Sequence, residues 1–135
     1  MKRHYFLGVV VVGLLLTLSG CKTVDTNFTP NTPTEVYFQR AQQASDQYDY
    51  QTSLKIYTEL LAKKDLDMST RVSAMYEVAF LHFKMGDRAL AKTQFQKILN
   101  MYNDPTLSNL PIWVQILSTK IIKEIDSGQK TNRQG

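Results

Sequence analysis

Cysteine occurs once in this chain of 135 residues, so no internal disulfide can form and helix packing must supply stability. Histidine is nearly as rare, because His4 and His82 are the only two. A metal site needs several His or Cys ligands at defined spacing, and a triad needs a nucleophile paired with its histidine. Gly86 stands alone, so a Gly-rich phosphate loop is absent from the sequence. We therefore expect no enzyme activity, no metal, no cofactor and no small-molecule substrate.

The longest apolar run lies at the start of the chain. Lys2 and Arg3 precede residues 6–16 (F-L-G-V-V-V-V-G-L-L-L), which carry no charge. This run is shorter than the roughly 20 residues of a membrane-spanning helix. A basic start followed by such a run predicts a secretory signal peptide.

The sequence L-S-G-C at residues 18–21 resembles a bacterial lipobox. In such signals the cysteine thiolate takes a diacylglyceryl group and becomes the first mature residue. The resemblance implies a signal peptide over residues 1–20, lipid attachment at Cys21 and a membrane partner. Lys22 stands where an aspartate would favour retention in the inner membrane, so the resemblance points to the outer membrane, facing the periplasm. An uncleaved anchor with an incidental cysteine is the alternative.

The charge of the chain is only mildly positive. Sixteen Lys and Arg face twelve Asp and Glu, for a net charge of +4, and removal of Lys2 and Arg3 with the signal peptide leaves +2. Both signs alternate along the chain, as on a solvated surface. This balance argues against a nucleic-acid partner.

Apolar residues at helical spacing organise residues 72–102. The pattern breaks at Gly86 and Asp87, where the glycine can end one helix and the aspartate can cap the next. These residues predict an antiparallel helical hairpin.

The hairpin resembles one tetratricopeptide repeat (TPR). Ala79 and Ala91 match the family's small residues on the first and second helix, and Gly86-Asp87 matches the turn between them. Phe95 matches the large aromatic residue, and Ile98 matches the apolar residue that follows it. Met75 and Val78 depart from the family's tryptophan and leucine, and the closing proline is displaced to Pro105. His82 lies on the inner stripe and is interpreted as a packed histidine.

A weaker copy of the hairpin lies 38 residues earlier, which indicates an internal repeat. Five pairs of residues match at this offset: Ala41 and Ala79, Asp49 and Asp87, Ser53 and Ala91, Tyr57 and Phe95, and Leu60 and Ile98. Tyr48 stands at the position of the turn glycine.

A fifth helix, over about residues 111–125, is expected to cover the open end of the two hairpins and to bury Trp113 and its isoleucines. Residues 32–126 thus predict an all-α domain, a short TPR-like α-solenoid of two helical hairpins plus a C-terminal capping helix. The polar residues 21–31 predict a flexible tether, and residues 127–135 a polar tail.

The TPR resemblance also implies a groove lined by the first helix of each pair. Its positions are Phe38, Gln42 and Ser45 in the first unit and Tyr76, Phe80, Phe83 and Lys84 in the second. Such an aromatic groove suits a helix or extended peptide of a protein partner. Alternatively, Phe80 and Phe83 are core residues covered by the first and fifth helices.

Two functions follow from these features. The first is a membrane-anchored interaction scaffold, or a pilot and assembly factor for an envelope machine such as a secretion system, a pilus or outer-membrane assembly. The alternative is an inhibitor, immunity or entry-exclusion lipoprotein that binds an incoming effector or transfer component.

Overall fold

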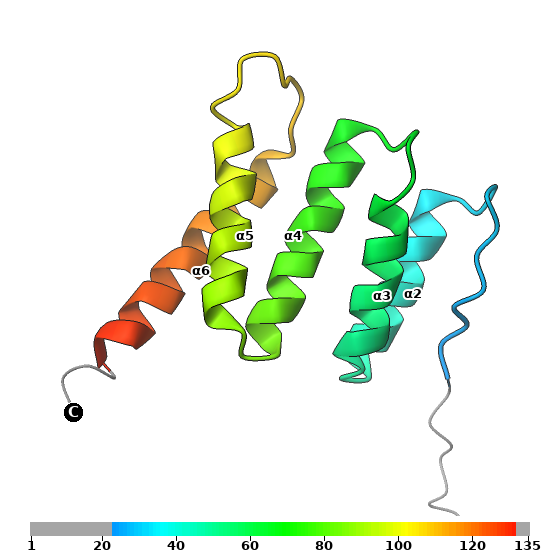
Figure 1. Ribbon diagram of the computed structural model, residues 1–135, viewed down its shortest axis with the longest axis horizontal. Helices are drawn as coiled ribbons and strands as arrows, with labels where there is room; N and C mark the ends of the chain where they lie inside the picture. The colour runs from blue at the N-terminus through cyan, green and yellow to red at the C-terminus, as the bar shows by residue number, and fades with distance from the viewer. Residues whose placement is uncertain (1–22, 132–135) are drawn as a thin grey trace, which may run out of the picture.

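The computed structural model of the protein describes residues 23–131, and every regular element among them is an α-helix. The helices, labelled as in Figure 1, are α2 (Thr34–Asp46), α3 (Tyr50–Leu61), α4 (Met68–Lys84), α5 (Arg88–Met101) and α6 (Ile112–Thr131). The signal peptide and Cys21, both predicted from the sequence, lie outside the described residues.

Side-chain caps set the starts of two helices. Asp49 accepts a hydrogen bond from the backbone N–H of Thr52 at 3.0 Å, and Asp67 caps α4 in the same way. Each cap satisfies an N–H that has no partner inside its helix. Hydrogen bonds from the side chains of Thr52 and Thr70, and then from their backbone N–H groups, hold the pKa of the two carboxyls below the usual value. Asp87 was predicted to cap α5, but its side chain makes no cap hydrogen bond and lies 3.6 Å from Nδ1 of His82.

Successive helices pack against one another, and α4 also contacts α6. Figure 1 shows α2 behind α3 and α6 behind α5, with α4 between these two overlapping pairs. The described residues therefore confirm the predicted all-α, TPR-like arrangement of two hairpins, α2–α3 and α4–α5, followed by a C-terminal helix.

Helix α4 belongs to both halves of the core. Ala74 and Leu81 pack with α2 and α3, whereas Val72 and Ala79 pack with α5 and α6. This double role explains why the sequence of α4 is apolar nearly all round. The positions matched between the two hairpins are buried as pairs: Ala41 and Ala79, Ser53 and Ala91, Tyr57 and Phe95, Leu60 and Ile98.

The two hairpins make the same turn with different residues. Gly86 has a φ of 91°, and Tyr48, at the equivalent position, has a φ of 61°. Both values lie in the left-handed region, which a residue with a Cβ enters at a cost of about 1–2 kcal/mol. The exposed Tyr48 therefore carries backbone strain that the second hairpin avoids.

Exchanging the residue types at these turns should change stability in opposite directions. We expect Tyr48→Gly to stabilise the domain and Gly86→Ala to destabilise it, each by about 1 kcal/mol. A Cβ at Gly86 meets no atom within 4 Å, so only the backbone conformation opposes the alanine. Urea unfolding of both variants measures the two effects, and a shift of the same sign in both would contradict this account of the turns.

Helix α6 buries only part of the stripe predicted for it, because Ile121 and Ile125 are buried as expected. Its buried residues follow i, i+4, i+7, i+11 spacing and are Val114, Ser118, Ile121 and Ile125. Trp113 is 41% exposed, and Ile112 and Ile116 are 63% and 60% exposed, so their predicted burial is wrong. Ser118 is fully buried and lies 39 residues after Ala79, the small buried residue on the first helix of the second hairpin. Helix α6 is therefore equivalent to the first helix of a third, incomplete unit.

The outer side of α6 is exposed because no further described helix packs there. The helix is also longer than predicted. It continues past Gly128 to Thr131, so that part of the expected polar tail is helical.

Residues 23–31, here called the strap, were expected to form a flexible tether but pack against the first hairpin. Val24 is only 8% exposed and joins the first core cluster. Phe28 stacks on Tyr37 of α2, with ring centroids 4.0 Å apart. Two apolar side chains in a polar stretch are too few to show periodicity, which is why the sequence pattern missed this packing.

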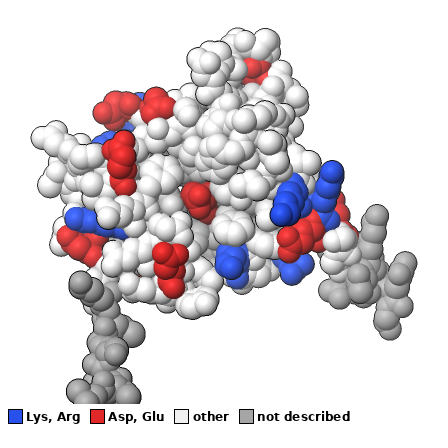
Figure 2. Space-filling model, turned by 180° about the vertical axis from the view of Figure 1, so that it is seen from behind, with Lys and Arg blue, Asp and Glu red and all other residues white. Residues whose placement is uncertain are grey.

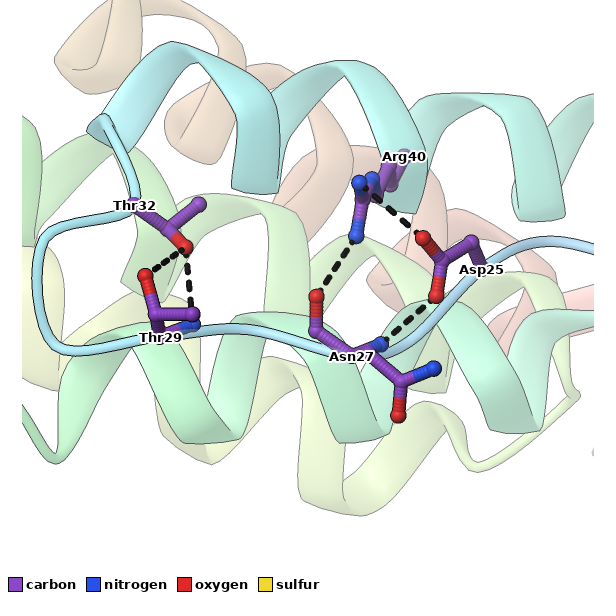
Figure 3. Close-up of polar contacts among 5 residues, drawn as sticks. All are labelled: Asp25, Asn27, Thr29, Thr32 and Arg40. Atoms are coloured by element: carbon purple, nitrogen blue, oxygen red, sulfur yellow. Dashed lines mark hydrogen bonds and ion pairs between the residues drawn. The ribbon is translucent and has the colours of Figure 1, made fainter.

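Arg40 of α2 holds the strap through charge and hydrogen bonding (Figure 3). Its Nη2 lies 3.2 Å from Oδ2 of Asp25, and its Nη1 donates to the backbone carbonyl of Asn27 at 2.9 Å. Farther along, the hydroxyl of Thr32 accepts from the backbone N–H of Thr29 at 2.8 Å. The chain is thus fixed to the domain from residue 24 onward.

Candidate interaction surface

Four aromatic side chains form a continuous row on the face that α4 shares with α6. Tyr76, Phe80 and Phe83 follow i, i+4, i+7 spacing on α4, so they lie on one side of the helix. The centroids of Tyr76 and Phe80 are 6.0 Å apart, and those of Phe80 and Phe83 are 6.1 Å apart. Trp113 of α6 extends the row by meeting Tyr76 edge-on at 5.2 Å. We call these four residues the aromatic row.

The aromatic row is neither fully covered nor fully open. Tyr76 is 6% exposed and contacts Phe95 beneath it, at a centroid distance of 5.6 Å. Phe80 and Phe83 are half-buried against the second core cluster, and Trp113 is exposed. The row therefore combines a rigid base with accessible aromatic edges, as binding surfaces of proteins often do.

Two cations lie at one end of the row. The Lys84 ammonium is 5.9 Å from the centroid of Phe80, and the guanidinium of Arg88 is 5.6 Å from that of Phe83. Arg88, at the start of α5, also lies against Gly128, where an added Cβ would come within 2.9 Å of its Nη1. Positive charge at this end is thus held over aromatic rings.

The predicted groove residues of α2 do not join the aromatic row through any described ring contact. Phe38 is half-buried in the first core cluster and meets Tyr57 edge-on at 5.3 Å. Gln42 is exposed, and its Nε2 donates to Oδ1 of Asp46 at 2.8 Å. Ser45 is partly buried. The predicted aromatic residues therefore divide between the two core clusters, with Phe38 in the first and Tyr76, Phe80 and Phe83 in the second.

Figure 2 shows the molecule from the side on which α2 and α6 lie in front. An acidic side chain lies near the middle of this face, and most other charged side chains lie below it and toward the edges, with uncharged surface between them.

Glu77 is a polar residue beside the aromatic row that sequence reasoning missed. It is partly buried, and burial raises the pKa of its carboxyl. Burial, with a smaller contribution from the Glu77 charge, also raises the pKa of Tyr57 and brings the pKa of Tyr76 to about 12. The seven-residue spacing from Glu77 to Lys84 would have placed both on one side of α4, which is the signal available in the sequence.

Other parts of the described structure offer less to a ligand. A surface pocket of about 870 Å³ lies at the α2–α3 turn and is lined mainly by polar side chains, with Thr23, Tyr48 and Lys55 among them. Residues 23–131 contain no cluster of three His, Cys, Asp or Glu side chains that could hold a metal ion. Among the described helices, none has the length and apolar character needed to span a bilayer.

Comparisons with protein-family models, curated proteins and solved structures give no match for this chain.

Proposed function

We propose that this protein is a lipid-anchored, TPR-like interaction scaffold or pilot that binds a segment of an envelope protein on its aromatic row. The proposed location is the outer membrane, facing the periplasm. The observation that carries the proposal is the aromatic row itself, four adjacent rings of which Phe80, Phe83 and Trp113 stay partly accessible where α4 meets α6.

The membrane part of the proposal rests on sequence and on the strap. L-S-G-C at residues 18–21 resembles a lipobox, and a lipidated, triacylated cysteine anchors far more firmly than one acyl chain. Val24 is packed into the core, so only residues 22 and 23 would separate a lipid on Cys21 from the folded domain. A link this short supports close apposition of the domain to the membrane surface.

The partner part of the proposal rests on the chemistry of the row. Aromatic side chains supply large contact areas with little loss of rotamer freedom, and they are enriched where proteins bind proteins. The row follows α4 along two turns, a geometry that fits a helix or an extended segment better than a compact small molecule. An assembly factor for a secretion system, pilus or outer-membrane machine would need both such a surface and an anchor.

Photo-crosslinking in membranes of the native host tests both parts. We expect a crosslinker at Lys84, whose ammonium lies over Phe80 of the row, to capture one envelope protein. Phe80→Ser/Phe83→Ser should abolish this capture without releasing the chain from the membrane. Cys21→Ser should instead remove the lipid anchor and move the chain from the membrane to the soluble fraction.

Leu90→Ser is the matched control, because Leu90 is an exposed apolar residue on α5 and belongs to neither the aromatic row nor a core cluster. It should leave capture and membrane association unchanged. Capture that persists in a folded Phe80→Ser/Phe83→Ser variant, verified by its thermal unfolding, would contradict the role of the aromatic row. Membrane association that survives Cys21→Ser would contradict the lipid anchor.

A further inference from the structure

We propose that Glu77 receives a basic side chain of the protein segment that binds on the aromatic row. This inference rests on the proposed function and specifies the chemistry of the partner. It assigns to Glu77 a role as a binding residue that selects a Lys or Arg at one position of the bound segment.

Glu77 is a partly buried acidic residue next to Tyr76 of the aromatic row on α4. Its carboxylate makes no hydrogen bond or ion pair with another residue of the described chain. The hydroxyls of Tyr57 and Tyr76 likewise have no hydrogen-bond partner among residues 23–128, whose side chains the structure describes. These three side chains come from α3 and α4, and the charge of Glu77 acts on both phenols. A carboxylate and two phenols without partners form a ready set of acceptors.

The described chain supplies no cation to Glu77. The cations close to the row, Lys84 and Arg88, lie over Phe80 and Phe83 instead. A partly buried carboxylate without a counter-charge is costly in the free protein, and a bound cation would relieve that cost. Carboxylates and aromatic faces both attract ammonium and guanidinium groups, so Glu77 beside Tyr76 matches a basic side chain.

The charges along α4 also give the bound segment a direction. Seven residues of α-helix span about 10 Å, which separates Glu77 from Lys84 along one side of α4. A partner whose basic residue meets Glu77 would place an acidic residue near Lys84. That spacing corresponds to about seven positions in a helical segment or about three in an extended one.

A random peptide display library, selected on the full-length chain in detergent micelles, is the probe. Peptides are retained if Phe80→Ser weakens their binding, which restricts the set to ligands of the aromatic row. We expect these peptides to share a Lys or Arg at one position. Glu77→Gln should weaken their binding about tenfold to a hundredfold, the range for losing a charge-assisted hydrogen bond.

A double-mutant cycle provides the decisive control. When the shared basic residue of the peptide is replaced by norleucine, Glu77→Gln should no longer change the affinity. Glu59→Gln, at an exposed position on α3, is the matched control and should have no effect on either peptide. Glu77→Gln should also fold normally, because burial already disfavours the charged carboxyl and raises its pKa.

The outcomes separate the two proposals. If peptides that depend on Phe80 show no shared basic residue, or bind Glu77→Gln as well as the unchanged chain, the role of Glu77 is refuted while the aromatic row stands as a binding surface. If no selected peptide depends on Phe80, both the proposed function and this inference fail.

Discussion

Removal of residues 111–135 is expected to abolish the cooperative unfolding transition of the domain. This deletion takes away α6, whose Val114, Ile121 and Ile125 are buried in the second core cluster. Val72, Tyr76 and Phe95 would then face water on an end of the solenoid that nothing covers. In repeat proteins the stability is the sum of unit and interface contributions, and two units without an end cap rarely suffice.

The deletion is read by thermal and urea unfolding followed by circular dichroism. A shorter deletion, of residues 132–135, is the control and should leave the midpoint nearly unchanged, since it leaves all of α6 in place. A truncation before Pro111 that still melts in one sharp transition, with undiminished helicity, would show that the two hairpins are stable alone.

Phe95→Ala is expected to be the most destabilising single substitution considered, lowering the free energy of unfolding by about 3–5 kcal/mol. Phe95 is the largest fully buried side chain, at the centre of the cluster formed by α4, α5 and α6. Its removal leaves a cavity and also takes the support from beneath Tyr76. The loss is a large part of the 5–15 kcal/mol typical of whole domains.

Leu90→Ala on the same helix is the comparison, because Leu90 is 46% exposed. Its effect on the free energy of unfolding should stay within about 0.5 kcal/mol. Both variants are measured by urea unfolding with a common slope. Comparable losses in the two would mean that the second cluster is not the main source of stability.

The contacts that stabilise the second core cluster also hold the aromatic row in place. Tyr76 rests on Phe95 and meets Trp113, so the row depends on α5 below and α6 beside it. Lys84 and Arg88 hold their charges over Phe80 and Phe83, which leaves Glu77 without a cation from the described chain. The proposed recognition of a basic side chain therefore follows from how the second hairpin is packed.

Local sequence pattern determined the number, order and pairing of the helices. The break at Gly86 and Asp87 marked the α4–α5 turn, and the 38-residue repeat placed Ala41 and Ala79 at equivalent buried positions. Such features are local, because helical periodicity and turn residues act within a few positions of one another. The same pattern also indicated Tyr76, Phe80, Phe83 and Lys84 as neighbours on one helix.

Contacts between distant segments decided the rest. The strap is fixed by Arg40, Val24 and Phe28, whose partners lie elsewhere in the sequence. The register of α6 was equally undetermined, since its sequence is apolar on two sides and only packing against α5 selects Val114 and Ser118 for burial. Glu77 became a candidate binding residue only when the fold left its carboxylate beside two tyrosines without a counter-charge, because burial and pairing are properties of the assembled structure.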